Sequence, residues 1–473
     1  MSSQNIATNR GYSASNLRII RRYLLLVSLF FLIAAPIGAA YTCEYRFFDN
    51  LWEILSSPCP LITDYFALAG LGSTLFNAAI CGLIANLIIH ISRAKTNATI
   101  CAGYMLIVAH CFYGLNFINM WPPFIGVILY CWVLKRKVSE NIHIAFFATA
   151  LAPFVSEVLF RYSIGKFDAS VTQISPIGII LALFCGIAVG FVVPALLPGT
   201  TAMHRGYNLY KAGLAIGILG IFIHAFMYNT LGLESPAVLK MENAAYASLP
   251  YSYRGFINVF FIALFSLTFL LGYLLSHGNI RSYRELLRCT GYGTDFTDKF
   301  GMPICLINIA VYGFAIIAYL NLVFILPSIF PQLPAGVGFT GPTVGVVFAA
   351  LTFAADGQHP RNVFPIVTGY VLLWAVVLGI CLISGFDIPW TLSTQSYING
   401  LAFATGLCPI AGKYGFKFGT LAGFMSAVIC TVTSGMHGGL VLYNGGLTAG
   451  LTALVLIPIL DFYHVKPKHE DDV

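Results

Sequence analysis

The sequence predicts an all-α polytopic membrane protein with about fourteen transmembrane segments, built as two seven-helix repeats of inverted topology with Gly/Pro-broken or re-entrant segments. Three observations predict this fold class. Of the 473 residues, 58% are hydrophobic and only 9% are charged, whereas a soluble domain carries about 25% charged residues. Four sequence blocks recur in the second half of the chain. Loops that carry Lys and Arg in one half correspond to loops with few or none in the other half.

The chain divides where apolar runs meet polar stretches. We expect a cytoplasmic tail (1–22), a first repeat (23–233), a polar connector (234–254), a second repeat (255–463) and a second cytoplasmic tail (464–473). About twenty apolar residues cross the bilayer core. The candidate spans are 23–42, 66–92, 98–114, 120–134, 143–160, 174–197, 211–232, 255–276, 302–326, 341–356, 363–384, 396–411, 416–433 and 445–462.

The strongest sign of duplication is a glycine-rich motif that occurs twice. The chain reads MHRGYNLYKAGLAIG from Met203 and MHGGLVLYNGGLTAG from Met436, 233 residues later. Other blocks recur in the same order, with offsets that change only at loops. They match Asn77 with Asn308, Asn119 with Asn362, and Pro153 with Pro409. In membrane proteins, two related halves of this kind commonly surround a transport site.

Loop charges predict that the second repeat is inverted. Lys and Arg favour cytoplasmic loops. In the first half such loops contain Arg93, Lys95 and the basic run 135–137, while the equivalent stretches 327–340 and 385–395 contain no Lys or Arg. Conversely, the loop 281–299 carries four basic residues, and its counterpart 43–62 carries one. Seven spans per repeat would invert the second half and place both termini in the cytoplasm. Arg161 and Lys166, in a loop expected outside, do not fit the pattern.

The two MHxG segments are candidates for broken helices. A helix that breaks at membrane depth exposes backbone groups that a solute can bind, and a half-helix starting at Gly213 or Gly446 would present a positive N-terminus to an anion. The alternative is an ordinary turn whose glycines permit tight helix packing. The candidate binding residues of these segments are His204, Arg205, Tyr210, His437 and Tyr443.

A second pair of blocks reads GLNFINMWPPFIG and GQHPRNVFPIVTG. Asn119 and Asn362 precede prolines at helix starts, so they either cap helices or bind solute. Tyr113 and Asn116 of the first block become Asp356 and His359 in the second, with Arg361 nearby. A carboxylate beside a histidine can carry a coupling proton. The alternative is a solvated cluster of loop charges.

Other polar residues sit within or beside apolar runs. Asn77 and Asn308 either line a pathway or clamp two helices, because a mid-span amide needs a partner. Thr343 begins another possible broken helix, and Thr99 is its weaker counterpart. Thr63-Asp64 and Thr294-Asp295 predict helix N-termini. Isolated histidines on apolar runs are expected to hydrogen-bond in the core: His90, His110 and His224.

The sequence contains no Walker loop, G-x-S-x-G or H-E-x-x-H motif, and it suggests no metal site and no cofactor. The basic residues sit in short loops that orient helices, so no nucleic-acid partner is expected. The twelve cysteines form no C-x-x-C pair, and only Cys43 and Cys59 share an expected external loop. The expected partners are the lipid bilayer, a small-molecule or ion substrate, and a second copy of the chain in a homo-oligomer.

The MHxG and GxxxxNxxP motifs resemble those of an uncharacterised bacterial family of multi-span membrane proteins of unknown function. That resemblance implies the bacterial cytoplasmic membrane but no substrate. The seven-plus-seven plan is similar in architecture to nucleobase and sulfate-type transporters, without their motifs. The leading hypothesis is a secondary transporter of a small polar or anionic solute, with Asp356 or His359 as the candidate site of a coupling proton. The alternatives are a membrane-embedded enzyme or lipid-handling protein, and a non-catalytic subunit of a membrane complex.

Overall fold

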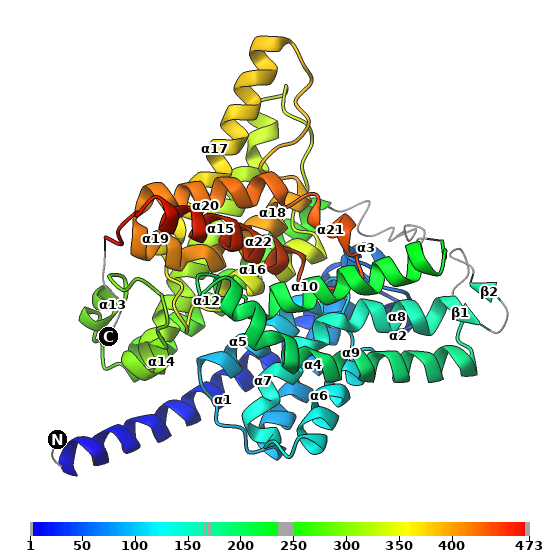
Figure 1. Cartoon of the computed structure of the whole chain (residues 1–473), viewed down its shortest axis with the longest axis horizontal. Helices are drawn as coiled ribbons and strands as arrows, with labels where there is room; N and C mark the ends of the chain where they lie inside the picture. The colour runs from blue at the N-terminus through cyan, green and yellow to red at the C-terminus, as the bar shows by residue number, and fades with distance from the viewer. Residues whose placement is uncertain (1–2, 164–165, 168–172, 235–249, 469–473) are drawn as a thin grey trace.

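A computed structural model shows an almost entirely helical protein and describes residues 3–163, 166–167, 173–234 and 250–468 (Figure 1). The helices of the first half are α1 (Ser3–Tyr41), α2 (Phe47–Ser56), α3 (Tyr65–Ala69), α4 (Leu71–Ile91), α5 (Ala98–His110), α6 (Trp121–Val133), α7 (Val138–Ala148), α8 (Ala152–Arg161), α9 (Pro176–Met203) and α10 (Lys211–His224). A 3-10 turn (Thr149–Leu151) joins α7 to α8, and a π-helical turn (Ala225–Thr230) continues α10. The described strands are β1 (Tyr162–Ser163) and β2 (Lys166–Phe167), which pair antiparallel.

The second half repeats this series of elements. Its helices are α12 (Pro250–Leu275), α13 (Arg281–Leu286), α14 (Phe296–Lys299), α15 (Met302–Ile329), α16 (Gly341–Leu351), α17 (Pro360–Ser384), α18 (Gln395–Ala404), α19 (Cys408–Tyr414), α20 (Phe416–Ile429), α21 (Thr433–Met436) and α22 (Asn444–Phe462), with a 3-10 turn (Thr405–Leu407) between α18 and α19. The helix α1 packs on α4 as α12 packs on α15, and α6 packs on α9 as α17 packs on α20.

Within the described residues, nine helical segments are long and apolar enough to cross a membrane, and α5, α6, α16 and α20 are shorter apolar helices. The chain is therefore a multi-pass membrane protein by length and composition. Several expected spans end early. The expected spans 98–114 and 341–356 end at His110 and Leu351, because non-helical turns with Gly114 and Gly357 at positive φ follow these helices.

Two expected boundaries differ from the structure. The expected tail 1–22 is mostly helical, since α1 begins at Ser3. Its Asn16 side chain donates to the Thr297 carbonyl at 2.9 Å and accepts from the Met302 backbone N–H at 3.0 Å, which ties it to the second half. Most of the expected connector 234–254 lies outside the described residues, but residues 250–254 form the first turn of α12. The last five residues of the C-terminal tail also lie outside the described range.

The two halves meet where α10 crosses α22 and where α5 crosses α16. A methyl group on Gly213 of α10 would lie 2.5 Å from the Cα of Gly446, its own counterpart in α22. Gly217 lies against Leu447, and Gly450 lies against Leu214. Gly217 and Gly450 are equivalent positions of the two repeats, as are Leu214 and Leu447, so the same contact occurs twice. Such a self-complementary contact is what a two-fold axis produces.

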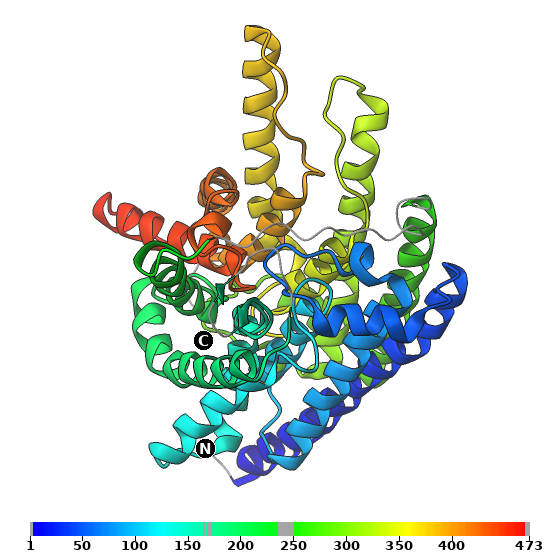
Figure 2. The same cartoon turned by 90° about the vertical axis from the view of Figure 1, so that its right-hand side faces the viewer.

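The C-terminal turns of α15 and α17 project from the body as two neighbouring pillars (Figure 2). Their counterparts are shorter: α15 has 28 residues where α4 has 21, and α17 has 25 where α6 has 13. Large apolar side chains on the pillars are exposed, including Leu322, Leu382 and Ile383. A surface of this kind suits the hydrocarbon core of a bilayer.

Candidate functional site

Two small cavities flank the crossing of the two halves, one beside the N-terminus of α10 and one beside the N-terminus of α22. The first has a volume of about 60 Å³ and is lined by Thr99, Leu106, Phe147, Leu209, Tyr210, Lys211, Ala212, Gly213, Phe353, Asp356 and Tyr443. The second has a volume of about 30 Å³ and is lined by Leu61, Ile62, Tyr113, Val346, Ser396, Asn399, Phe403, Cys430, Ser434, Leu442, Asn444 and Gly445. We call them the charged cavity and the neutral cavity.

The two cavities occupy equivalent positions in the two repeats. Lys211 of the charged cavity corresponds to Asn444 of the neutral cavity, and Asp356 corresponds to Tyr113. Phe147 corresponds in the same way to Phe403. Each lies near the end of a helix, α7 or α18, that is followed by a 3-10 turn. The repeat thus conserves the place of the cavity but changes its charge. Four of the residues predicted from sequence meet in the charged cavity: Thr99, Tyr210, Asp356 and Tyr443.

Asp356 lies in the turn that follows α16, outside both neighbouring helices, and its side chain is half-buried. Burial raises the pKa of the Asp356 carboxyl to about 8; the carboxylates of Asp295 and Asp298 add to the rise, and the Lys211 ammonium opposes it. Lys211 itself is exposed at the first residue of α10, so it forms the outer rim of the charged cavity. The carboxyl group therefore exchanges its proton near neutral pH at the edge of an accessible cavity.

Asn77 and Asn308 hold the turns that carry these residues. The Asn77 amide donates to the carbonyls of Cys111 and Leu115 at 3.0 and 2.9 Å. The Asn308 amide donates to the carbonyls of Ala354 and Gln358, both at 2.7 Å. Both asparagines are fully buried. Each amide hydrogen-bonds the turn after a short helix, α5 or α16, and so clamps that turn to the longer helix, α4 or α15.

Asn119, His359 and Asn362 also have structural partners. His359 is the N-cap of α17: its Nδ1 accepts from the Asn362 backbone N–H at 3.2 Å, and its Nε2 donates to the Cys289 carbonyl at 2.9 Å. The Asn362 amide donates to the Gly357 carbonyl at 2.8 Å, as Asn119 donates to Gly114 at 2.9 Å. Since both His359 nitrogens are engaged, the imidazole is held in one neutral tautomer. Of the paired candidates for a coupling proton, Asp356 remains.

The other predicted residues lie outside the two cavities. Arg205 pairs with Asp461 of α22 at the surface, and Arg361 is exposed at the first turn of α17. Thr343 is buried and exchanges hydrogen bonds with Thr340 and Gln395. His437 contacts the Asn444 amide oxygen at 3.2 Å through Nε2. His204 is fully buried, and neither of its ring nitrogens has a hydrogen-bond partner among the described residues.

Sequence reasoning missed His110 and Tyr113. His110 is 1% exposed and was expected to hydrogen-bond in the core, but neither ring nitrogen has a partner within the described chain. The expectation was wrong, because α5 places this ring among aromatic side chains. Tyr113 lines the neutral cavity with its hydroxyl likewise unpaired. The available signal was the repeat itself, since Tyr113 stands where the second half has Asp356.

Arg161 resolves one exception to the loop-charge pattern. It ends α8 and pairs with Glu157 at 3.0 Å, and both side chains are 1% exposed. Arg161 is therefore a buried counter-ion and not a loop charge. The cysteines expected to share a loop, Cys43 and Cys59, are both free, with Cys43 exposed and Cys59 buried.

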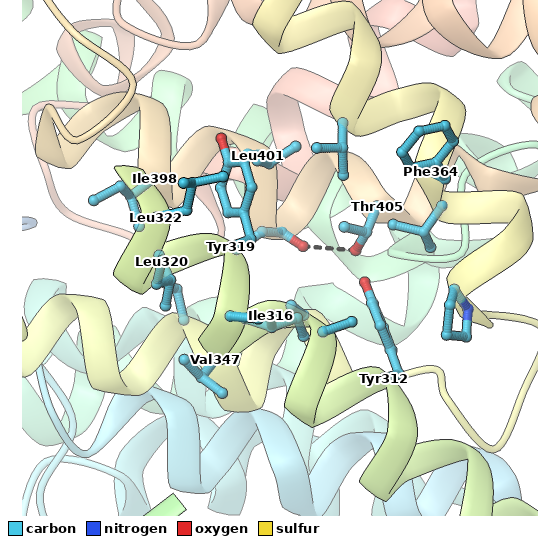
Figure 3. Close-up of a pocket in the computed structure, with 18 residues that line it drawn as sticks. Tyr312, Ile316, Tyr319, Leu320, Leu322, Val347, Phe364, Ile398, Leu401 and Thr405 are labelled. Carbon is cyan, nitrogen blue, oxygen red and sulfur yellow. Dashed lines mark hydrogen bonds between the residues drawn. The ribbon is translucent and has the colours of Figure 1, made fainter. Parts of the chain in front are cut away.

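An apolar groove of about 400 Å³ is bounded by α15, α16, α17 and α18. Figure 3 shows its aliphatic and aromatic side chains, with the Tyr312 hydroxyl pointing toward Thr405. Thr405 donates to the Ala402 carbonyl at 2.7 Å and accepts from the Gln358 amide at 2.7 Å. The groove is suited to an apolar chain, and its lining lacks charged groups such as those of the charged cavity.

One protein family matches the chain twice, over residues 43–229 and 276–462, and its description is protein of unknown function (DUF1576). The chain belongs to the DUF1576 family. The two matched stretches of this DUF1576 protein begin 233 residues apart, the same offset that separates Met203 from Met436. The duplication seen in the sequence is therefore also seen in the family match. No curated protein and no solved structure is similar enough to the chain to count as a match.

Proposed function

We propose that this protein is a secondary active transporter of a small polar or anionic solute. It would work by alternating access, with two inverted repeats moving against each other. The observation that carries the proposal is the pair of equivalent cavities on either side of the crossing of the halves. Transporters with duplicated halves bind their solute where the repeats meet, at the ends of interrupted helices. Here the cavities lie at the N-termini of α10 and α22 and beside the short helices α5 and α16.

Inverted topology is supported by the packing of equivalent helices. The helix α16 is antiparallel to its equivalent α5, because Gly341 lies against Phe112 while Gly345 lies against Ala109. If two equivalent helices both cross a bilayer and run antiparallel, they cross it in opposite directions. Their two-fold axis then lies in the membrane plane. The loop charges lead to the same arrangement, with both termini in the cytoplasm of a bacterial cell.

Asp356 is the proposed site of the coupling proton. Its carboxyl faces the charged cavity, and its pKa of about 8 lets it bind and release a proton under physiological conditions. With the carboxyl protonated, Lys211 leaves the cavity positive and suited to an anion. With the carboxyl ionised, its charge opposes anion binding. Proton and anion would then bind together, which is the linkage that a symporter requires.

Flux into proteoliposomes of purified protein tests the proposal. Preparations should accumulate at least one class of small solute when a proton gradient is imposed, and a protonophore should abolish that accumulation. Empty liposomes and protein with Asp356→Asn are the matched controls. Absence of gradient-driven flux across anionic, neutral and cationic small solutes would overturn the proposal. Chemical modification of a lipid head group by the protein in the same vesicles would instead support a membrane-embedded enzyme.

A further inference from the structure

Between the two cavities lies a group of three polar side chains that the preceding mechanism does not use. His110, Tyr113 and Tyr443 are each about 1% exposed. The His110 ring lies 5.6 Å from the Tyr113 ring and 5.1 Å from the Tyr443 ring, centroid to centroid, in edge-on contacts. We call these three residues the central cluster.

The central cluster connects the two cavities. Tyr443 lines the charged cavity and Tyr113 lines the neutral cavity, with His110 between them. The three residues come from both halves, since Tyr443 immediately precedes α22 and the other two end α5 or follow it. The cluster thus sits at the crossing of the repeats, where an alternating-access transporter must hold its solute.

The side-chain polar atoms of the central cluster lack partners among the described residues. Neither nitrogen of His110, nor the hydroxyl of Tyr113 or Tyr443, has a hydrogen-bond partner in the described part of the chain. A buried polar atom of this kind is costly, and native proteins seldom keep one without a reason. Three such side chains in contact with one another are hard to explain as packing alone.

The matching positions of the other repeat show what a purely structural arrangement looks like. Phe353 takes the place of His110, and its ring lies 4.8 Å from that of Tyr210, the counterpart of Tyr443. The Tyr210 hydroxyl donates to the Ala349 carbonyl and is satisfied. The same fold therefore accepts an apolar ring and a bonded hydroxyl here, so it does not require the unpaired atoms of the central cluster.

We propose that His110, Tyr113 and Tyr443 bind the transported solute directly and that this solute is a small monovalent oxyanion, an inference that rests on the proposed transport function. A neutral imidazole supplies one N–H donor and each tyrosine one O–H donor, so the cluster offers three donors. Oxyanions accept several such bonds, and donors to a charged acceptor bind more strongly than donors to a neutral one. Lys211 at the rim supplies the attraction that brings an anion in. The cavity volumes of about 60 and 30 Å³ limit the solute to a few heavy atoms.

The decisive variant is His110→Phe, which copies the residue of the other repeat. Removing unpaired buried polar atoms should leave the melting temperature of the purified protein unchanged or raise it. Uptake of radiolabelled formate, acetate and nitrate into proteoliposomes should fall at least about tenfold, the loss expected for one hydrogen bond to a charged group. Tyr443→Phe and Tyr113→Phe should behave alike. Tyr104→Phe is the matched control: it removes a buried hydroxyl that is hydrogen-bonded to Ser28 and lies outside both cavities, so it should lower the melting temperature and largely spare uptake.

The outcomes separate this inference from the proposed function. Wild-type rates in His110→Phe and Tyr443→Phe would overturn the role of the cluster while leaving transport intact. A lowered melting temperature in both variants, with uptake lost in proportion to unfolded protein, would show that the cluster is structural. Wild-type flux of urea or glycerol without flux of the three anions would overturn the oxyanion class. No flux of any solute by wild-type protein would instead refute the proposed function itself.

Discussion

Alanine at Gly213 tests the backbone contact between α10 and α22 on which the two-fold arrangement depends. The added methyl group would lie 2.5 Å from the Cα and 2.6 Å from the carbonyl carbon of Gly446, whereas carbon atoms pack best at about 3.5–4.0 Å. Both contacted atoms belong to the backbone, so no rotamer change relieves the overlap and the helices must separate by about 1 Å. Overpacking of this kind costs about 1–3 kcal/mol, and the higher helix propensity of alanine offsets up to about 1 kcal/mol.

The unfolding of Gly213→Ala can be followed in detergent with a thiol-reactive dye, because most of the twelve free cysteines are buried. We expect a melting temperature lower than wild type by about 2 °C or more. Gly446→Ala should lower it less, since its nearest backbone contact is 2.9 Å. Gly379→Ala, in the projecting part of α17 with nothing within 4 Å, should leave it unchanged or higher. A Gly213→Ala protein as stable as Gly379→Ala would show that the two helices do not cross in backbone contact.

Three further predictions concern the buried polar groups. Asn77→Ala should cost about 1–3 kcal/mol in thermal unfolding because it leaves two buried carbonyls without a donor. Asn141→Ala, which removes a solvent-exposed hydrogen bond to the Lys137 carbonyl, should change stability by less than about 0.5 kcal/mol. Equal melting temperatures of the two variants would contradict the clamp. Arg161→Met should cost about 3–5 kcal/mol by leaving the Glu157 carboxylate buried and unpaired, and Glu157→Leu added to it should restore most of the loss; no recovery in the double variant would argue against the ion pair. Solute uptake should decline as the pH on the side of the charged cavity rises through about 8, because Asp356 loses its proton, and Asp356→Asn should flatten the profile; an unchanged profile would exclude this carboxyl as the coupling site.

Several local features could be predicted from sequence because they depend on near neighbours. Asp64 and Asp295 were expected at helix N-termini, and their carboxylates accept backbone N–H groups at the starts of α3 and α14. The short half-helices were harder to place, because an apolar run does not reveal where a turn ends it. Asn77 shows the same limit: its acceptors, Cys111 and Leu115, are more than thirty residues away along the chain. A sequence pattern indicates that a buried amide needs partners but not which ones it finds.

By itself, the sequence determined the membrane class and the duplication, because apolar content, glycine-rich motifs and their offset are properties of the linear chain. Tertiary structure alone decided which polar residues meet. It assigned His359 to a helix cap, gathered Thr99, Asp356 and Tyr443 around one cavity, and left His110 buried between two tyrosines without a bond. The physical reason is that these outcomes depend on how two repeats cross at Gly213 and Gly446, where a few tenths of an ångström in helix separation decide which atoms lie within hydrogen-bond distance.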